Sequence, residues 1–343
     1  MYETLSLEQI RRIGNIPMYF VVGAERSGTT LLQVMLNAHP EIVAPPESKF
    51  IVLLYKKYGF INQWSEKNIR SFCSDIYKEG LLKKLWGIDR EQLLSSLLAA
   101  KEIATFPLLC KLVFYHASRG KKPRLFIDKN PVYYYAIPEL ISIFPDAKFI
   151  HIVRDFRANM NSYKQVFRLK NPADIAYRWM KSNILIEKSR RTSPQDYHTV
   201  KYEELVNTPE LYMRKICEFI GLSYHEKMVN DHTTGIYPSF YGNNKKGFMK
   251  FYGRIFQPID STVNESWRKE LSTKEVAEAE EVAGKFGSRY YGYNLSPERK
   301  TSKNHVNKFI MKLKYNLMKN FDMAALFNPW LYFNMRGQVW RSF

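Results

Sequence analysis

The chain of 343 residues is long enough for one large α/β domain or two small ones, and its 45% hydrophobic residues can supply a sizeable core. Its formal net charge of +19 favours anionic partners, namely nucleotide phosphates, acidic glycans, nucleic acid or an anionic membrane surface. No run of eighteen apolar residues occurs, so we expect no transmembrane helix. The three cysteines are widely spaced and form no C-x-x-C pattern, which indicates reduced cysteines in the core.

The N-terminal residues 1–15 are charged and have no apolar core, so we expect neither a signal peptide nor an anchor, and we predict a cytoplasmic protein. The apolar run Met18–Val22 follows and is typical of a strand buried on both faces. Gly23 to Gly28 forms a turn, and residues 29–36 carry apolar side chains at helical spacing. A strand, a glycine-bracketed loop and a helix can bind phosphate, because the backbone N–H groups of the loop and the helix N-terminus point at the anion.

The two glycines have the spacing of the nucleotide-triphosphatase loop G-x-x-x-x-G-K-[ST], but Thr29 occupies the lysine position. Arg26 is the only cation of this loop, and Ser27, Thr29 and Thr30 are candidate hydroxyl donors to a phosphate. The glycine pair alone is equally typical of a phosphate-binding loop and of an ordinary strand-to-helix turn. The interpretation of the loop therefore depends on the rest of the chain.

A short strand is predicted at Ile42–Ala44, and Glu47 follows it after two prolines. Glu47 is either a carboxylate in the first turn of a helix or a functional group. Residues 49–122 are helical and aromatic in pattern and contain no phosphate loop. We interpret them as an inserted helical cap.

Two further predicted strands each lead into a charged residue. Leu125–Ile127 is followed closely by Lys129, and Lys148–Val153 is followed by Arg154. Catalytic and binding residues of open α/β sheets gather at the carboxyl ends of the strands, so both cations are candidates, although a surface position is the commoner fate of a lysine. His151 lies inside its strand, and we interpret it as a packed core histidine.

The second half of the chain continues the alternation of helices and strands. A helix is predicted from Pro172 to about Arg191, a strand at Tyr197–Tyr202, a long loop at 235–254, and a capping box at Ser272-x-x-Glu275. This alternation indicates an α/β, P-loop-like three-layer fold with a mainly parallel central sheet, helices on both faces and the helical cap. We predict one domain over residues 1–298.

Residues 299–343 form a basic, aromatic tail. Between Arg299 and Phe321 there are seven basic residues and no acidic one. One helical face is apolar and consists of Val306, Phe309, Ile310, Leu313 and Leu317. This helix either docks on the core, which we favour, or lies peripherally on an anionic membrane surface at its inner face.

The motifs resemble those of the sulfotransferases that use 3′-phosphoadenosine 5′-phosphosulfate (PAPS). Arg26-Ser-Gly-Thr-Thr-Leu-Leu and the nearby Asn37-Ala-His-Pro are similar to the family's 5′-phosphosulfate loop. Arg154, with Ser162 eight positions later, resembles its 3′-phosphate site. Further similar strings begin at Asp128, Lys201 and Trp267, so the resemblance covers about residues 18–295.

The resemblance implies a sulfuryl transfer from PAPS to an acceptor hydroxyl, with adenosine 3′,5′-bisphosphate as the product. Arg26 would stabilise the leaving phosphate, and Arg154 and Ser162 would bind the 3′-phosphate. A third contact to that phosphate would come from Arg254 or from Lys245 and Lys246. No metal ion is expected, because a sulfuryl group carries less charge than a terminal phosphoryl group.

The base that accepts the proton of the acceptor hydroxyl is implied by one branch of the family. The protein-tyrosine branch places a glutamate twenty-one positions after the loop arginine, which is Glu47 here, and Lys129 matches the lysine at the reacting centre. The chain departs from the family at Glu25, where a proline is common. We expect Glu25 to point outward or to orient Arg26.

Two alternatives remain at this stage: a P-loop small-molecule kinase, which the missing lysine disfavours, and a non-enzymatic polyanion-binding module. We expect no nucleic-acid partner. The aromatic and basic residues Tyr55, Lys56, Lys57 and Tyr58 of the cap suit a sugar, a glycan or a glycolipid as the acceptor. They suit other hydroxyl acceptors as well.

Overall fold

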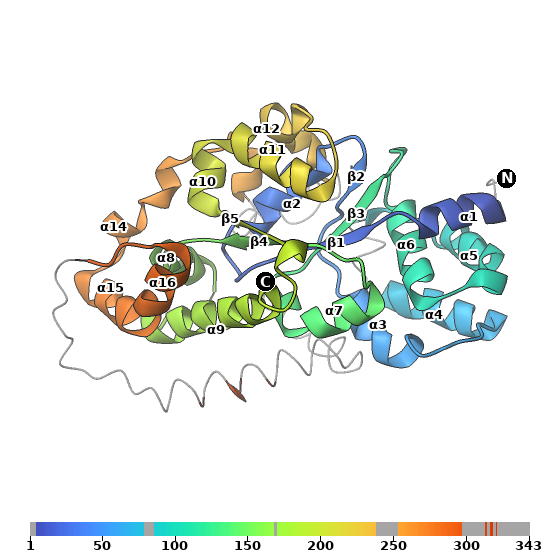
Figure 1. Cartoon of the computed structure of the whole chain (residues 1–343), viewed down its shortest axis with the longest axis horizontal. Helices are drawn as coiled ribbons and strands as arrows, with labels where there is room; N and C mark the ends of the chain where they lie inside the picture. Colours follow the sequence, from blue (N-terminus) through green and yellow to red (C-terminus); the bar gives the residue numbers. More distant parts are fainter. Residues whose placement is uncertain are drawn as a thin grey trace.

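The computed structural model describes residues 5–78, 86–167, 170–237 and 253–296, and also residues 313, 316, 317 and 320. Five parallel strands form one sheet in the order β2-β3-β1-β4-β5 (Figure 1). The strands are β1 Met18–Val22, β2 Ile42–Val43, β3 Leu125–Lys129, β4 Phe149–Val153 and β5 Tyr197–Lys201. The central strand β1 is buried along its whole length, as its continuous apolar run predicts.

The predicted strands are all present, with differences at their ends. β2 ends at Val43, one residue earlier than predicted. β3 continues through Lys129, so Asp128 and Lys129 pair with Phe20 and Val21 of β1. The predicted strand ended at Ile127, where the apolar run ends, and the observed strand includes two charged residues, which are rare inside a buried strand.

Helices cover both faces of the sheet (Figure 1). Alternate residues of β1 separate the two layers: Tyr19 and Val21 pack with the helices of one face, and Phe20 and Val22 pack with those of the other. The first face carries α2 Thr29–Asn37, α10 Tyr202–Asn207, α11 Pro209–Ile220 and α12 Lys227–Asn230. The second face carries α7 Ile137–Ile143 and α9 Pro172–Arg190. The predicted three-layer α/β class is confirmed.

The predicted cap region is helical in its described parts. It contains α3 Phe50–Tyr58, α4 Glu66–Lys78, α5 Arg90–Ala99 and α6 Phe106–His116. Helix α1 Leu7–Gly14 was not predicted; it begins with a capping box formed by Ser6 and Gln9 and packs against α6.

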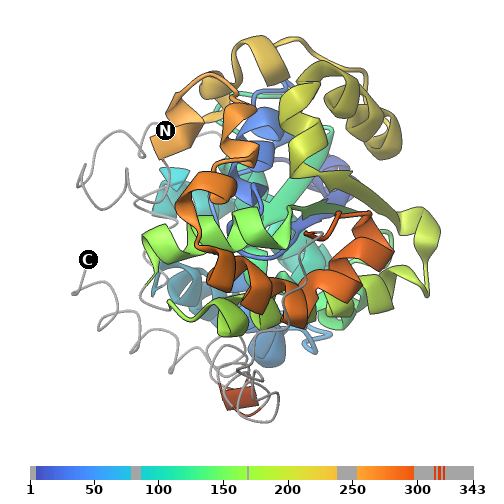
Figure 2. The same cartoon turned by 90° about the vertical axis from the view of Figure 1, so that its left-hand side faces the viewer.

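A third group of helices covers the end of the sheet where β4 leads into α8 Phe156–Val166. It contains α14 Trp267–Glu270, α15 Thr273–Ala279 and α16 Lys285–Tyr291. Figure 2 shows these orange and red helices lying beside α8 and α9. The predicted capping box at Ser272 and Glu275 is confirmed, but the helix it opens contains a π-helical turn, Glu280–Gly284. Such turns are frequent near functional sites.

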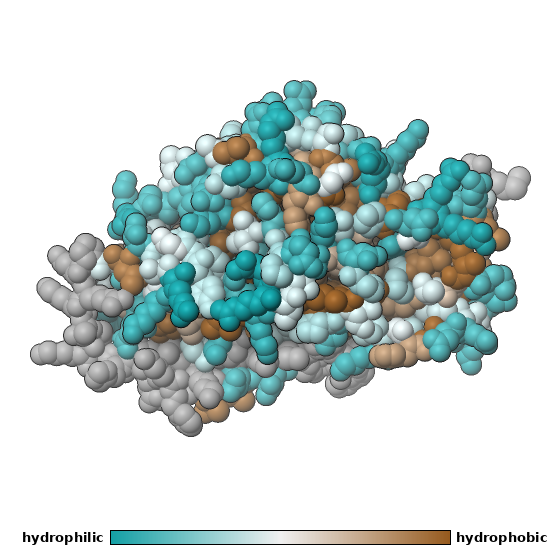
Figure 3. All heavy atoms as spheres, viewed as in Figure 1, coloured by the Kyte–Doolittle hydropathy of each residue, from teal (hydrophilic) through white to brown (hydrophobic). Residues whose placement is uncertain are grey.

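The surface seen in Figure 3 is mostly hydrophilic, with separate apolar patches. All three cysteines are buried and free, as predicted. Within the described ranges, no helix is long and apolar enough to cross a membrane. Most of the predicted tail helix lies outside the described residues; Leu313 and Leu317 of its apolar face are described, and their exposed fractions are 51% and 64%.

Candidate active site

The loop between β1 and α2 adopts a conformation that requires its glycines. Gly28 precedes α2 with φ of 95°, and a Cβ atom there would lie 2.3 Å from Cδ2 of Tyr202. A Cβ atom on Gly23 would lie 2.4 Å from the carbonyl oxygen of Ile152. Arg26 also has a positive φ of 68°, a left-handed conformation that costs energy for a residue with a side chain. The loop therefore stores backbone strain beside the N-terminus of α2.

Side chains from α8 hold this loop in place. The buried amide of Asn159 donates to the carbonyl oxygen of Glu25 at 2.7 Å and to Oγ of Ser27 at 3.1 Å. Nε of Arg26 donates to Oγ of Ser162 at 3.2 Å. The contact between Arg26 and Ser162 brings the two predicted anion-binding elements together. Asn159 lies in α8 between Arg154 and Ser162, and no local sequence pattern marks it as part of the site.

Arg154 lies directly after β4, as predicted, and only 5% of it is exposed. Its guanidinium donates to the carbonyl oxygens of Arg26 at 3.5 Å and Val263 at 3.3 Å, and it stacks 4.4 Å from the centre of the Tyr202 ring. Burial lowers the pKa of Arg154, and Arg254 adds to this effect. Its Nε is buried and has no hydrogen-bond partner among the described residues. A buried guanidinium with an unsatisfied donor is suited to an anion.

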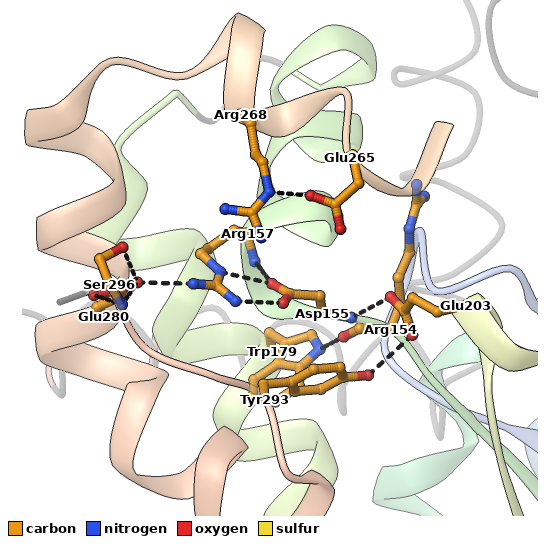
Figure 4. Close-up of polar contacts among 10 residues, drawn as sticks. All are labelled: Arg154, Asp155, Arg157, Trp179, Glu203, Glu265, Arg268, Glu280, Tyr293 and Ser296. Carbon is orange, nitrogen blue, oxygen red and sulfur yellow. Dashed lines mark hydrogen bonds and ion pairs between the residues drawn. The ribbon is translucent and has the colours of Figure 1, made fainter. Parts of the chain in front are cut away.

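The main chain around Arg154 is fixed by a polar network (Figure 4). The indole of Trp179 donates to the carbonyl oxygen of Arg154 at 3.0 Å, and the carboxylate of Glu203 accepts the N–H of Asp155 at 2.8 Å. Tyr293 donates to the same carboxylate at 3.3 Å. Burial raises the pKa of Glu203 above its ordinary value. Glu203 belongs to the family-like string that begins at Lys201, but its contact with Asp155 was not predicted.

The same network continues away from Arg154 to the π-helical turn. Arg157 pairs with Asp155 at 2.6 Å and with Glu280 of the π-helical turn at 2.8 Å, and both pairs are buried (Figure 4). Glu280 also accepts the N–H of Ser296 at 3.1 Å. Because Arg157 contacts carboxylates on both sides, it ties the start of α8 to the helices at this end of the sheet.

The third part of the site contains Glu47 and Lys129. Lys129 is 1% exposed, and its ammonium contacts Glu47 and donates to Oγ1 of Thr30 at 3.2 Å. The side chain of Glu47 is 30% exposed. Lys129, the last residue of β3, thus places its ammonium group at the start of α2. The loop itself has Thr29 where the triphosphatase pattern has its lysine.

Glu47 lies in the connection between β2 and α3, and this connection is held from both sides. The indole of Trp86 in the cap donates to the carbonyl oxygen of Pro46 at 2.9 Å. The hydroxyl of Tyr133 donates to the carbonyl oxygen of Ser48 at 3.0 Å. The alternative of a first-turn helix carboxylate is wrong, because α3 begins at Phe50 and has no acidic residue in its first turn.

The residues described above lie in a region that matches a known protein family. A model described as "Sulfotransferase family" matches residues 17–226, which include both anion-binding elements and the pair of Glu47 and Lys129. This chain belongs to the sulfotransferase family. The predicted family membership is therefore confirmed.

Two of the sulfotransferase relatives are named protein-tyrosine sulfotransferases. The Drosophila melanogaster protein is 30% identical over 228 residues, 63% of this chain and 41% of that protein. Protein-tyrosine sulfotransferase A of Caenorhabditis elegans is 26% identical over 288 residues, 82% of this chain and 69% of that protein. Among solved structures, the sulfotransferase domain of the Synechococcus PCC 7002 olefin synthase is 25% identical, with a TM-score of 0.54, covering 82% of this chain and 96% of that domain.

The remaining predicted site residues lie as follows. Arg254 is exposed, in a short 3₁₀-helix Gly253–Phe256, close enough to Arg154 to lower its pKa. Lys245 and Lys246 lie outside the described residues. Ser27 and Thr29 are buried at the start of α2. No group of three or more His, Cys, Asp or Glu that could hold a metal ion occurs in the part of the chain that the structure describes.

The cap residues that suggested a sugar acceptor have other contacts. Tyr58 is 2% exposed, and its hydroxyl donates to Asp75 at 2.7 Å. Lys57 pairs with the same carboxylate at 2.6 Å, and the hydroxyl of Tyr55 contacts Ser142. All three side chains are engaged within the cap or with α7, so they do not support a sugar acceptor.

Proposed function

We propose that this chain transfers a sulfuryl group from PAPS to an acceptor hydroxyl and releases adenosine 3′,5′-bisphosphate. One observation carries the proposal: the loop after β1 and the buried Arg154 after β4 meet at Arg26, whose side chain contacts Ser162 and whose carbonyl contacts Arg154. PAPS carries a 5′-phosphosulfate and a 3′-phosphate, and these two elements offer one binding group for each.

The residues of both elements fit the donor. Gly28 precedes the N-terminus of α2, where unpaired backbone N–H groups suit a 5′-phosphate, and the missing Cβ atom lets the Tyr202 ring pack against this turn. The hydroxyls of Ser27, Thr29 and Thr30 also suit the 5′-phosphate. The unsatisfied Nε of Arg154 and the hydroxyl of Ser162 suit the 3′-phosphate, and Arg254 is the nearby third candidate. When PAPS is bound, it supplies the activated sulfuryl group.

The reaction breaks the bond between sulfur and the bridging phosphate oxygen and forms a bond between sulfur and the acceptor oxygen. Glu47 accepts the proton of the acceptor hydroxyl, which increases the nucleophilicity of its oxygen. Lys129 and Arg26 place positive charge where the leaving phosphate gains negative charge. Lys129 contacts both Glu47 and Thr30, so it holds the base next to the donor loop.

The acceptor that we propose first is a tyrosine side chain of a polypeptide, because the relatives named above are protein-tyrosine sulfotransferases. The helical cap borders the acceptor side, since Trp86 contacts the connection that carries Glu47. A sugar, glycan or glycolipid hydroxyl is the second candidate. It depends on the charge of the chain alone, because Tyr55, Lys57 and Tyr58 are engaged within the cap or with α7.

Two measurements test the proposal. Thermal shift with adenosine 3′,5′-bisphosphate and with ATP should give stabilisation by the bisphosphate only. Labelled PAPS with a panel of tyrosine peptides and sugars should then identify the acceptor class. Stabilisation by ATP alone would favour the kinase, and no response to either nucleotide would favour a polyanion-binding module.

A further inference from the structure

The carboxylate of Glu25 lies next to the loop that we propose for the donor, and it is paired with Arg178. Nη2 of Arg178 is 2.6 Å from Oε1 of Glu25, and Nε is 3.4 Å from Oε2, so the guanidinium contacts both oxygens. The side chains of Arg178 and Glu25 are 9% and 16% exposed. The expected outward orientation of Glu25 is therefore wrong. Its side chain is turned towards α9.

This pair has an electrostatic consequence for the loop. Burial alone would raise the pKa of Glu25, but the charge and the hydrogen bond of Arg178 hold it below its ordinary value, with a smaller contribution from Lys49. Glu25 is therefore ionised at neutral pH, one residue before Arg26. Without Arg178, a buried negative charge would oppose the binding of an anion at the loop.

The pair also has a mechanical consequence. Arg26 is held in the left-handed region, and such a conformation persists only where surrounding contacts fix it. On one side, Asn159 binds the carbonyl oxygen of Glu25 and the hydroxyl of Ser27. On the other side, Arg178 binds the side chain of Glu25. α8 and α9 thus fix the residue before Arg26 through its main chain and its side chain.

We propose that Arg178 is a positioning residue for the donor loop: it neutralises Glu25 and holds the loop in the conformation that binds the 5′-phosphate. This inference rests on the proposed function, because it assigns the 5′-phosphate to the same loop. Arg178 itself needs no contact with the donor. Its effect passes through Glu25 and the main chain of Arg26.

The test compares Arg178→Met, Glu25→Gln and the double variant by calorimetric titration with two probes, adenosine 3′,5′-bisphosphate and adenosine 5′-monophosphate. We expect Arg178→Met to lower the affinity for both nucleotides by about tenfold or more and by the same factor, because both carry the 5′-phosphate. Glu25→Gln removes the charge and should weaken binding by less than about threefold. The double variant should bind more tightly than Arg178→Met, because no unpaired carboxylate remains.

The matched control is Arg214→Met, which removes an arginine from the exposed pair with Glu210 on α11 and should leave both affinities unchanged. Wild-type affinity in Arg178→Met, or a double variant no better than it, would overturn the proposal. Should Arg178→Met not fold, Arg178→Gln takes its place with the same expectations and the same contrary outcomes. A wild-type protein that binds neither nucleotide would instead overturn the proposed function.

Discussion

The proposed site has a donor side, which contains Arg26 and Arg154, and a reacting side, which contains Glu47 and Lys129. The two sides differ in how many surrounding groups fix their side chains. On the donor side, Arg26 and Arg154 are surrounded by many fixed groups from α8, α9 and α10, including Asn159, Trp179 and Tyr202. On the reacting side, Glu47 and Lys129 are the two groups proposed for the chemical step, and Glu47 lies in a connection without helix or strand. We infer that donor binding is distributed over many contacts, whereas the chemical step depends on very few.

The largest effect is therefore expected at Glu47. Glu47→Gln keeps the size of the side chain but removes its ability to accept a proton, so turnover should fall by about 10²- to 10⁴-fold. Affinity for adenosine 3′,5′-bisphosphate should remain within about threefold of the wild type, because glutamine keeps the shape and hydrogen-bonding capacity of the side chain and the bisphosphate carries no acceptor. The two quantities are measured by transfer from labelled PAPS and by calorimetry.

The amount of turnover that remains decides the role of Glu47. A folded Glu47→Gln protein with wild-type turnover would remove Glu47 from the mechanism. A protein that has lost donor affinity as well would show that the two sides of the site are coupled.

The second effect concerns the donor side and is smaller. Arg154→Ala should lower the affinity for adenosine 3′,5′-bisphosphate by roughly ten- to a hundredfold, which corresponds to the loss of one charge-assisted hydrogen bond. Adenosine 5′-monophosphate lacks the 3′-phosphate, so its affinity should change far less. Calorimetric titration of both nucleotides measures the difference. Equal weakening would place Arg154 away from the 3′-phosphate.

The sequence alone predicted those site residues that lie at the ends of strands, because a buried strand is recognisable from its apolar run. Arg26, Lys129 and Arg154 follow or end buried strands, and parallel strands bring their carboxyl ends to one edge of the sheet. Their approach to one another was therefore predictable. The exact partners of Lys129 were not, because Glu47 and Thr30 are 82 and 99 positions away in the chain.

The supporting groups were not predictable for the same reason. Arg178 reaches Glu25 across 153 positions, and Asn159 reaches Ser27 across 132. Neither residue differs in local pattern from an ordinary polar residue on a helix. The interpretation of Tyr58, by contrast, was an avoidable error. It lies on the same helical face as Phe50, Ile51 and Leu54, and that spacing predicts burial.

The smallest effect concerns His151 in β4, the strand that leads into Arg154. The ring is fully buried, and its Nε2 is 2.9 Å from Oδ1 of Asn183. Asn183 donates its Nδ2 to the carbonyl oxygen of Trp179, so Oδ1 is the acceptor and His151 carries its proton on Nε2. Nδ1 lies 3.9 Å from Glu187 and has no hydrogen-bond partner in the described part of the chain.

Burial lowers the pKa of His151 to about 4, although the Asn183 contact and Glu187 act in the opposite direction and Arg190 adds to the lowering. The folded state thus favours the neutral ring. Its stabilising contribution is complete above the ordinary pKa of 6.5 and is lost as the pH falls towards 4. At pH of about 5.5 the unfolded chain already binds this proton and the folded protein does not, which costs roughly 1 kcal/mol of unfolding free energy.

His151→Gln should remove this contribution. Glutamine can still donate to Asn183 but does not titrate, so the free energy of unfolding should fall by roughly 1 kcal/mol less between pH values of about 7.5 and 5.5 than in the wild type. Urea unfolding at the two pH values measures the change. Because burial also lowers the pKa of His39, His116 and His198, only the difference between the two proteins reports on His151. Equal losses in both proteins would mean that protonation of His151 does not contribute to the loss of stability in acid.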